Sequence, residues 1–176
     1  MRQEEQNRNV GADTCFDAVT KQNEKRSSLV TSHPDNSHTL AGYFSDRTHI
    51  LPVRVYYEDT DFSGIVYHAN YLRFLERGRT DSLRLAGIDQ SQLHANGEGL
   101  IFAVRRMTID YFKPALMDDV LHVETLTREV RGASLIIDQR IMRGDEVIVT
   151  AEVRVAAIAG GKPARIPEGV REVLGG

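Results

Sequence analysis

The segment "HANYLRFLERGRTDSLRLAG", residues 68–87, decides the fold, because it is the long helical pattern in a region otherwise rich in strand patterns. Small and apolar residues recur along it at spacings of four and three, as on the buried face of an amphipathic helix: Tyr71, Leu75, Gly78, Ser82 and Leu85. Gly87 suits the position just after such a helix. Gly78 costs about 1 kcal/mol relative to Ala inside a helix, so we expect another element to pack closely against it.

Strand patterns flank this helix on both sides. "HILPVRVYYE" (49–58) precedes it, and four β-rich segments follow it, within residues 100–114, 118–132, 133–146 and 147–161. The short connections at 130–133 and 143–146 join the last three as antiparallel hairpins. The order of one strand, a helix and four strands predicts an α+β fold, in which a curved antiparallel five-stranded sheet wraps around a long central helix. The other face of that sheet is left for a second subunit.

Composition changes near residue 49. Residues 1–49 are polar with sparse apolar positions, and we expect a disordered arm there. A docking arm or a targeting peptide is the alternative, although the acidic residues Glu4, Glu5, Asp13 and Asp17 argue against an organellar presequence. Residues 50–160 form the predicted globular domain, and residues 161–176 form a tail with a short helix that begins near Pro167.

The overall composition excludes several classes of protein. The 176 residues are 41% hydrophobic and 27% charged with a net charge of -3, which is typical of a soluble globular chain and does not favour nucleic acid as a partner. Long apolar runs and a secretory signal are missing. The one cysteine, Cys15, permits no intrachain disulfide. A reducing, cytoplasmic location agrees with this pattern.

The loop before the helix, "DTDFSGIVYHAN" (59–70), permits three interpretations. It contains good turn residues and Gly64, which a strand-to-helix connection needs in any case. It also resembles a calcium-binding EF-hand loop, but position twelve is Asn70 rather than Glu, and a strand rather than a helix precedes it. In the third interpretation it is an active site, because a carboxylate faces the free N–H groups and the positive dipole end of a helix.

Such an active site suits attack on an activated acyl group. The helix amides would stabilise negative charge that develops on a carbonyl oxygen, and the carboxylate would act as a nucleophile or as a general base on water. A thioester is the most suitable substrate, because a carboxylate is a weak nucleophile and needs a good leaving group. The core region contains no Gly-x-Ser-x-Gly motif and no cysteine, so a serine or cysteine nucleophile of the common kind is missing.

The segment "VRVYYEDTDFSGIVYHANYLRFLERGRTDSLR" (53–84) resembles the signature of the 4-hydroxybenzoyl-CoA thioesterase family of hotdog-fold proteins. Within that family the likeness is strongest to the tol-pal system-associated acyl-CoA thioesterases of Gram-negative bacteria, and it covers about residues 50–158. The resemblance implies a hotdog fold and hydrolysis of acyl-CoA to free acid and CoA. It also implies no metal, no redox cofactor, and assembly into dimers of hotdogs or homotetramers.

The resemblance assigns roles to particular residues. Asp61 is the catalytic carboxylate, the His68 backbone N–H polarises the thioester carbonyl, Tyr67 precedes it, and Gly64 permits the tight turn. Basic residues near the cleft bind the CoA arm, and the candidates are Arg105, Arg106, Lys113 and Arg131. The likeness also suggests an acyl carrier protein as a partner, and a peripheral link to the inner membrane and the Tol-Pal system.

Alternatives stay open for residues and for function. Arg105 and Arg106 are adjacent on a strand and should point to opposite faces. Glu76 is a second candidate carboxylate, because some hotdog thioesterases carry theirs on the helix, although a solvated ion pair with neighbouring arginines is the better explanation. A hotdog hydratase, and a non-catalytic binding module for acyl thioesters or acyl carrier protein in an envelope-associated complex, are the other functions considered.

Overall fold

The structure is a computed structural model, and it describes residues 40–95 and 99–175. Most of the predicted arm, residues 1–39, lies outside the described residues. The described strands form one antiparallel sheet: β1 (Tyr43–Ser45), β2 (Thr48–Arg54), β3 (Ile101–Tyr111), β4 (Val120–Arg131), β5 (Ser134–Arg143), β6 (Glu146–Ala159) and β7 (Lys162–Pro163). The helices are η1 (Tyr57–Asp59, a 3-10 turn), α3 (His68–Leu85), α4 (Gln90–Ala95) and α5 (Glu168–Gly175).

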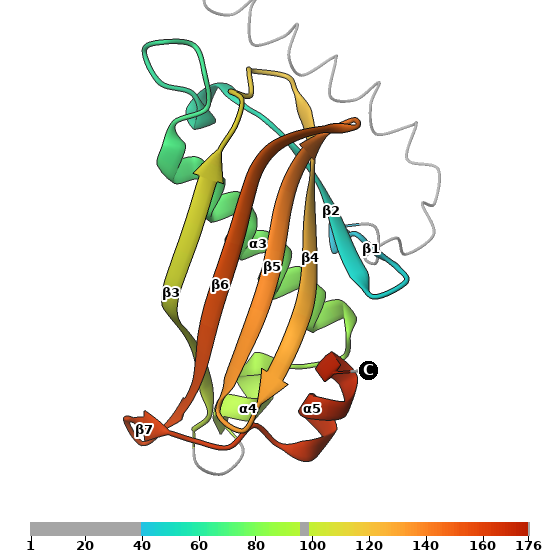
Figure 1. Cartoon of the computed structure of the whole chain (residues 1–176), viewed down its shortest axis with the longest axis vertical. Helices are drawn as coiled ribbons and strands as arrows, with labels where there is room; N and C mark the ends of the chain where they lie inside the picture. The colour runs from blue at the N-terminus through green and yellow to red at the C-terminus, as the bar shows by residue number, and fades with distance from the viewer. Residues whose placement is uncertain (1–39, 96–98, 176) are drawn as a thin grey trace, which may run out of the picture. The chain divides into compact units, whose positions relative to one another are not determined.

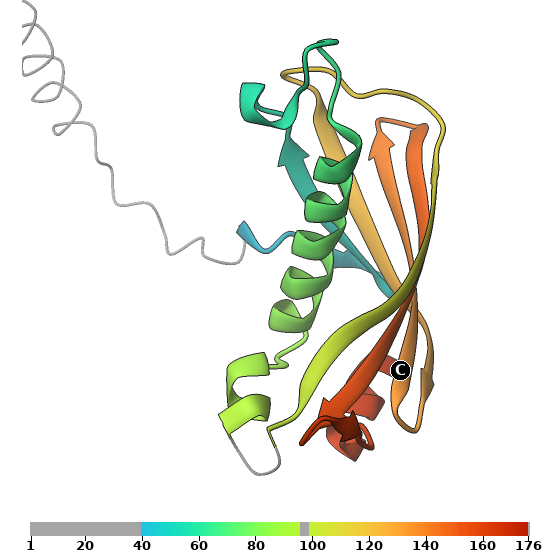
Figure 2. The ribbon, with the colours of Figure 1, turned by 90° about the vertical axis from the view of Figure 1, so that its left-hand side faces the viewer.

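The sheet has the strand order β1-β2-β4-β5-β6-β3, and β7 pairs with the end of β6. The long helix α3 runs along one face of this curved sheet (Figures 1 and 2). The predicted architecture is therefore confirmed, with the five predicted strands present as β2 to β6 and two short strands added. The strand β3 forms one edge of the sheet, so one side of its backbone has no neighbour in the described chain (Figure 1).

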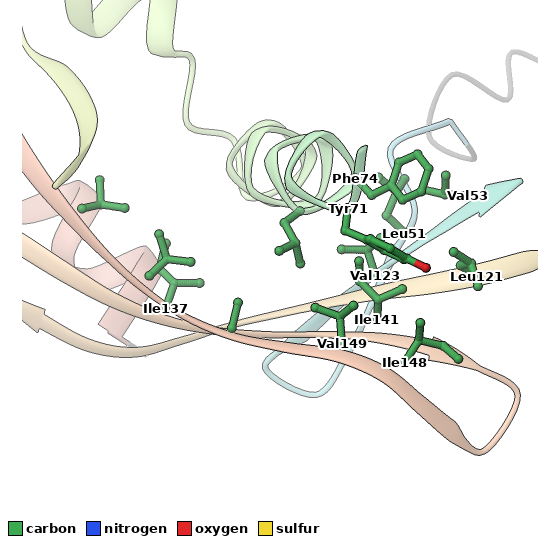
Figure 3. Packing of buried hydrophobic residues seen from close by; sticks show 14 of the residues in the cluster. Leu51, Val53, Tyr71, Phe74, Leu121, Val123, Ile137, Ile141, Ile148 and Val149 are labelled. Atoms are coloured by element: carbon green, nitrogen blue, oxygen red, sulfur yellow. The ribbon is translucent and has the colours of Figure 1, made fainter. Parts of the chain in front are cut away.

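The core lies between α3 and the sheet. Phe74 and Leu75 are fully buried, and Tyr71 is 3% exposed. Figure 3 shows Tyr71 and Phe74 projecting from α3 toward side chains of β2, β4, β5 and β6. Burial of one large apolar side chain stabilises the fold by about 1.5–3 kcal/mol, so this stripe fixes α3 on the sheet.

Two glycines explain the packing of α3 and its end. A Cβ on Gly78 would lie 2.7 Å from Val123 Cγ1, which confirms the predicted close contact at this position. Gly87 has φ +76°, and its N–H donates to the Arg84 carbonyl while the Ile88 N–H donates to the Leu83 carbonyl. These two bonds form a Schellman motif, which ends the helix where the sequence indicated.

Regular structure begins before the predicted boundary at residue 49, which falls inside β2. Two contacts hold residues 41–51 together. Gly42 has φ +75°, and a Cβ there would lie 2.2 Å from the Ile50 carbonyl oxygen. His49 is fully buried, and its Nε2 lies 2.6 Å from the Ala41 carbonyl oxygen. The pairing of β1 with β2 depends on close backbone approach and on one buried histidine. It therefore leaves no apolar pattern in the sequence that would predict it.

Candidate active site

Asp59 anchors the loop that leads into α3. Its Oδ2 accepts a hydrogen bond from the Tyr56 N–H at 2.9 Å, and its side chain is buried. Its carbonyl oxygen accepts from the Tyr67 N–H at 2.9 Å and from Asn70 Nδ2 at 2.8 Å. These bonds close residues 59–67 into one compact turn, which we call the candidate loop. Asp59 therefore braces the turn with both its side chain and its carbonyl oxygen.

Asp61 lies exposed within the candidate loop. Its Oδ1 accepts the Ser63 N–H at 2.8 Å, while its backbone bonds to Ile65 and Gly64 at 2.9 and 3.0 Å. Gly64 has φ +75°, a conformation that glycine adopts without strain. In the described part of the chain, Asp61 Oδ2 has no hydrogen-bond partner, so the carboxylate is oriented by one oxygen and offers the other to a reactant.

His68 is the first residue of α3, and Tyr67 is its N-cap without a side-chain cap. The first N–H groups of a helix have no intrahelical acceptor, and no described residue accepts from the His68 N–H. This end of α3 therefore presents a free amide donor with the positive end of the helix dipole. The Tyr67 and His68 rings lie 4.4 Å apart between centroids, and Tyr111 Oη donates to the His68 carbonyl at 3.3 Å.

Three of the four basic candidates lie together. Arg105, Arg106 and Arg131 line a groove of about 410 Å³ on the outer face of the sheet, with Arg154. Among the described residues, Arg105 and Arg106 make no ion pair, whereas Arg131 is paired with Glu129 and Arg154 with Glu152. At Arg105 and Arg106 the groove therefore presents positive charge that no described carboxylate neutralises.

The prediction that Arg105 and Arg106 point to opposite faces is wrong. In the β3–β6 register Val104 faces Val155 and Arg106 faces Arg154, so Arg105 is the extra residue of a β-bulge. A bulge interrupts the alternation of side chains, and both arginines consequently line the same groove.

Lys113 lies beyond the other end of β3. It forms an ion pair with Glu146 at the β5–β6 hairpin, and its N–H bonds to the Ile148 carbonyl. Eight residues separate it from Arg105, which corresponds to about 26 Å along an extended strand. The groove and Lys113 are thus separate basic positions within one chain.

Glu76 forms the ion pair that the sequence suggested, but its partner is buried. Arg79 pairs with the half-exposed Glu76, and its Nη1 donates to Gln139 Oε1 at 2.7 Å. Gln139 Nε2 donates in turn to the Leu75 carbonyl and to Thr125 Oγ1, each at 2.9 Å. Through Arg79 and Gln139, Glu76 is therefore part of a hydrogen-bond network that holds α3 on the sheet.

The residues that sequence reasoning missed lie around the candidate loop. Asn70 stands at position twelve of the EF-hand-like pattern, yet its side chain donates a hydrogen bond to the Asp59 carbonyl. Tyr71 and Arg143 bond to residues 115 and 114, and residue 115 contacts the loop. A polar residue in the first turn of a helix, as Asn70 is, was a usable signal, whereas nothing local marked Arg143.

The geometry disfavours the EF-hand interpretation, because the Asp59 carboxylate is buried and occupied by the Tyr56 amide. In residues 40–95 and 99–175, no cluster of three or more His, Cys, Asp or Glu side chains is arranged to hold a metal ion. The described helices are also too short or too polar to cross a membrane.

A curved antiparallel sheet wrapped around one long helix defines a hotdog fold. Residues 55–174 match the sequence model of the Thioesterase-like superfamily, and the chain belongs to that family.

Individual relatives agree with this assignment. The acyl-CoA thioesterase YbgC of Haemophilus influenzae is 46% identical over 123 residues, which cover 69% of this chain and 90% of that protein. The acyl-CoA thioester hydrolase YbgC of Escherichia coli O6:H1 is 43% identical over 122 residues, 68% of this chain and 90% of that protein. A probable thioesterase from Bartonella henselae has a crystal structure with a TM-score of 0.66 and 44% identity, over 68% of this chain and 99% of that one.

Proposed function

We propose that this protein hydrolyses the thioester bond of an acyl-CoA to give the free acid and CoA. The observation that carries the proposal is the candidate loop, which joins the exposed Asp61 carboxylate to the free amide of His68 in one closed turn. Relatives at 43–46% identity bear the names of acyl-CoA thioesterases and thioester hydrolases.

In the proposed reaction the thioester oxygen accepts a hydrogen bond from the His68 N–H. Negative charge develops on that oxygen during attack, and the amide together with the helix dipole stabilises it. Asp61 either attacks the carbonyl carbon, which releases CoA thiolate and leaves a mixed anhydride for water to cleave, or removes a proton from an attacking water. Both routes need only Asp61, the His68 amide and water.

The experiment is thiol release from a panel of short, long and aromatic acyl-CoAs by the wild type and Asp61→Asn. General base or nucleophilic catalysis accounts for about 10²–10⁴ in rate, so we expect Asp61→Asn to lose at least about 100-fold in kcat while it stays folded. Glu172→Gln is the matched control, because Glu172 is an exposed carboxylate on α5 rather than on β3. If the wild type binds acyl-CoA or acyl carrier protein without turnover, the loop is a recognition element and the proposal fails.

We further propose a homo-oligomer in which a second copy pairs with the free edge of β3. Exposed apolar side chains follow this strand: Ile101 is 46%, Val104 48% and Tyr111 44% exposed. An antiparallel pairing of β3 with its copy places the Tyr111 end of one strand beside the Ile101 end of the other. The arginine groove of one copy then lies at the same end of the paired sheet as the candidate loop of its partner, and there it binds the phosphates of CoA, since guanidinium groups bind phosphate well.

Mixed oligomers test this arrangement. Asp61→Asn and the double variant Arg105→Glu/Arg106→Glu should each lose activity when pure. If the site combines Asp61 of one copy with arginines of the other, co-refolded mixtures regain activity, because a heterodimer then contains one intact site. If groove and loop act within one copy, the mixture stays inactive. Light scattering should give the mass of a dimer or tetramer.

We also propose a cytoplasmic protein with a link to acyl carrier protein and the Tol-Pal system. The support is the resemblance in residues 50–158 stated above. Co-purification of Tol-Pal components or acyl carrier protein with the tagged full chain, against an unrelated hotdog protein as control, tests this proposal.

A further inference from the structure

A cluster of charged side chains joins the β5–β6 hairpin to residues 113–119, which we call the supporting segment. Arg143 Nη1 donates to Asp119 Oδ2 at 2.7 Å and to the Pro114 carbonyl at 3.3 Å. Its Nη2 donates to Glu146 Oε2 at 2.5 Å, and Lys113 pairs with the same carboxylate. One guanidinium therefore connects three acceptors across the hairpin and the supporting segment.

The supporting segment in turn holds the candidate loop. The Val66 N–H donates to the Ala115 carbonyl at 2.9 Å, and Ile65 forms an antiparallel bridge with Leu116. The Ala115 N–H donates to Tyr71 Oη at 2.9 Å, one turn into α3. Ala115 is fully buried and Tyr71 is 3% exposed, so water does not replace these bonds. The loop and the start of α3 are thereby tied to the same short segment.

The charged cluster stays ionised at neutral pH. Burial alone would raise the pKa of Asp119, but hydrogen bonds from the Leu116 N–H and from Arg143 outweigh it and lower that pKa. Hydrogen bonds from Lys113 and then Arg143 lower the pKa of Glu146. Arg143 has a side chain that is 31% exposed, and it makes several bonds at once, unlike isolated surface ion pairs, which contribute little.

We propose that Arg143 is a positioning residue for thioester hydrolysis, which it serves by fixing the supporting segment and, through Ala115, the candidate loop. The inference rests on the proposed function. The His68 amide and the Asp61 carboxylate must meet one carbonyl group from two sides, and a displacement of about 1 Å costs about 100-fold in rate. Loss of Arg143 therefore lowers the rate of the chemical step more than the binding of substrate.

The test compares Arg143→Gln, Arg143→Lys and the control Arg140→Gln in the full chain. Arg140 lies on the same strand and pairs with Glu124 alone, with a side chain 56% exposed. We expect Arg143→Gln to lose at least about tenfold in kcat with KM changed less than about threefold, since only the chemical step needs the fixed geometry. Arg143→Lys recovers part of the loss, because lysine keeps the charge without the fork. Arg140→Gln matches the wild type.

Hydrogen exchange of the peptide covering residues 60–70 gives a second readout that needs no substrate. Faster exchange there in Arg143→Gln, but not in Arg140→Gln, supports the inference. A folded Arg143→Gln with wild-type kcat and wild-type exchange overturns it. If wild type turns over no thioester, the proposed function fails while exchange still decides whether Arg143 holds the loop. If Arg143→Gln does not fold, Asp119→Asn takes its place with the same expectations.

Discussion

Replacing Gly78 by alanine tests how tightly α3 packs on the sheet. The new Cβ would lie 2.7 Å from Val123 Cγ1, 2.9 Å from Thr125 Oγ1 and 3.4 Å from Gln139 Nε2. Val123 is fully buried and its branched side chain has few alternative rotamers. Thr125 accepts the Gln139 hydrogen bond, so its displacement strains the buried polar network.

The magnitude follows from three contributions. Overpacking costs about 1–3 kcal/mol, the strained hydrogen bond adds about 1 kcal/mol, and the better helix propensity of alanine offsets about 1 kcal/mol. The expected net loss is about 1–3 kcal/mol, which lowers Tm by about 4–12 °C at roughly 4 °C per kcal/mol.

Thermal and urea unfolding monitored by circular dichroism measure this loss. Gly169→Ala is the matched control, since Gly169 also lies in a helix, α5, and a Cβ there meets nothing within 4 Å. It should leave Tm unchanged or raise it slightly. If Gly78→Ala melts at or above the wild-type temperature, the contact at Gly78 is not a close one and the reasoning is refuted.

Two further predictions concern the support of the candidate loop. Tyr71→Phe removes the acceptor of the buried Ala115 N–H and should cost about 1–3 kcal/mol in urea unfolding, whereas an unchanged midpoint would show that the amide finds another partner. The stabilisation by Arg143 should be lost in acid: the lowered pKa of Asp119 means that the contact acts fully above the ordinary carboxyl pKa of about 4 and disappears as pH falls through the lowered value. The Tm difference between wild type and Arg143→Gln should therefore be constant from about pH 7 to 5 and shrink below about pH 4, and a constant difference at pH 3 would contradict this.

Local pattern was enough to predict the elements that carry the fold. The apolar spacing in α3 has the period of a helix, and the alternation in β6 has the period of a strand. The short connections at 130–133 and 143–146 predict the hairpins. Gly78 predicted a close contact, because glycine inside a helix lowers its stability and needs a reason. The reason is that Val123 and Thr125 on the sheet leave no room for a Cβ. The candidate loop was also recognisable, since its turn residues and its position before a helix are both local features.

The failures occur where one extra residue shifts the alternation of a strand. Arg105 is the extra residue in β3, and a second irregularity lies where Ile141 faces Val149 but Met142 faces Val147. As a result Ile148 is fully buried, whereas Val147, which shares the alternation of Val149 and Ala151 in the sequence, is only partly buried. A bulge is defined by the strand opposite, so the single strand's own sequence does not reveal it.

Arg143 shows the same limit at the level of function. The sequence around it, Arg143-Gly144-Asp145-Glu146, is that of an ordinary hairpin. The ion pair with Glu146 forms between the two ends of that turn and involves no distant residue. Its other acceptors, Pro114 and Asp119, come from a segment more than 20 residues earlier. The candidate loop is therefore built in two parts: local turn bonds shape it, and long-range bonds through Ala115 place it. Substitutions of Asp59 or Gly64 should then change the shape of the loop, whereas substitution of Arg143 should leave that shape intact and change its position relative to the sheet.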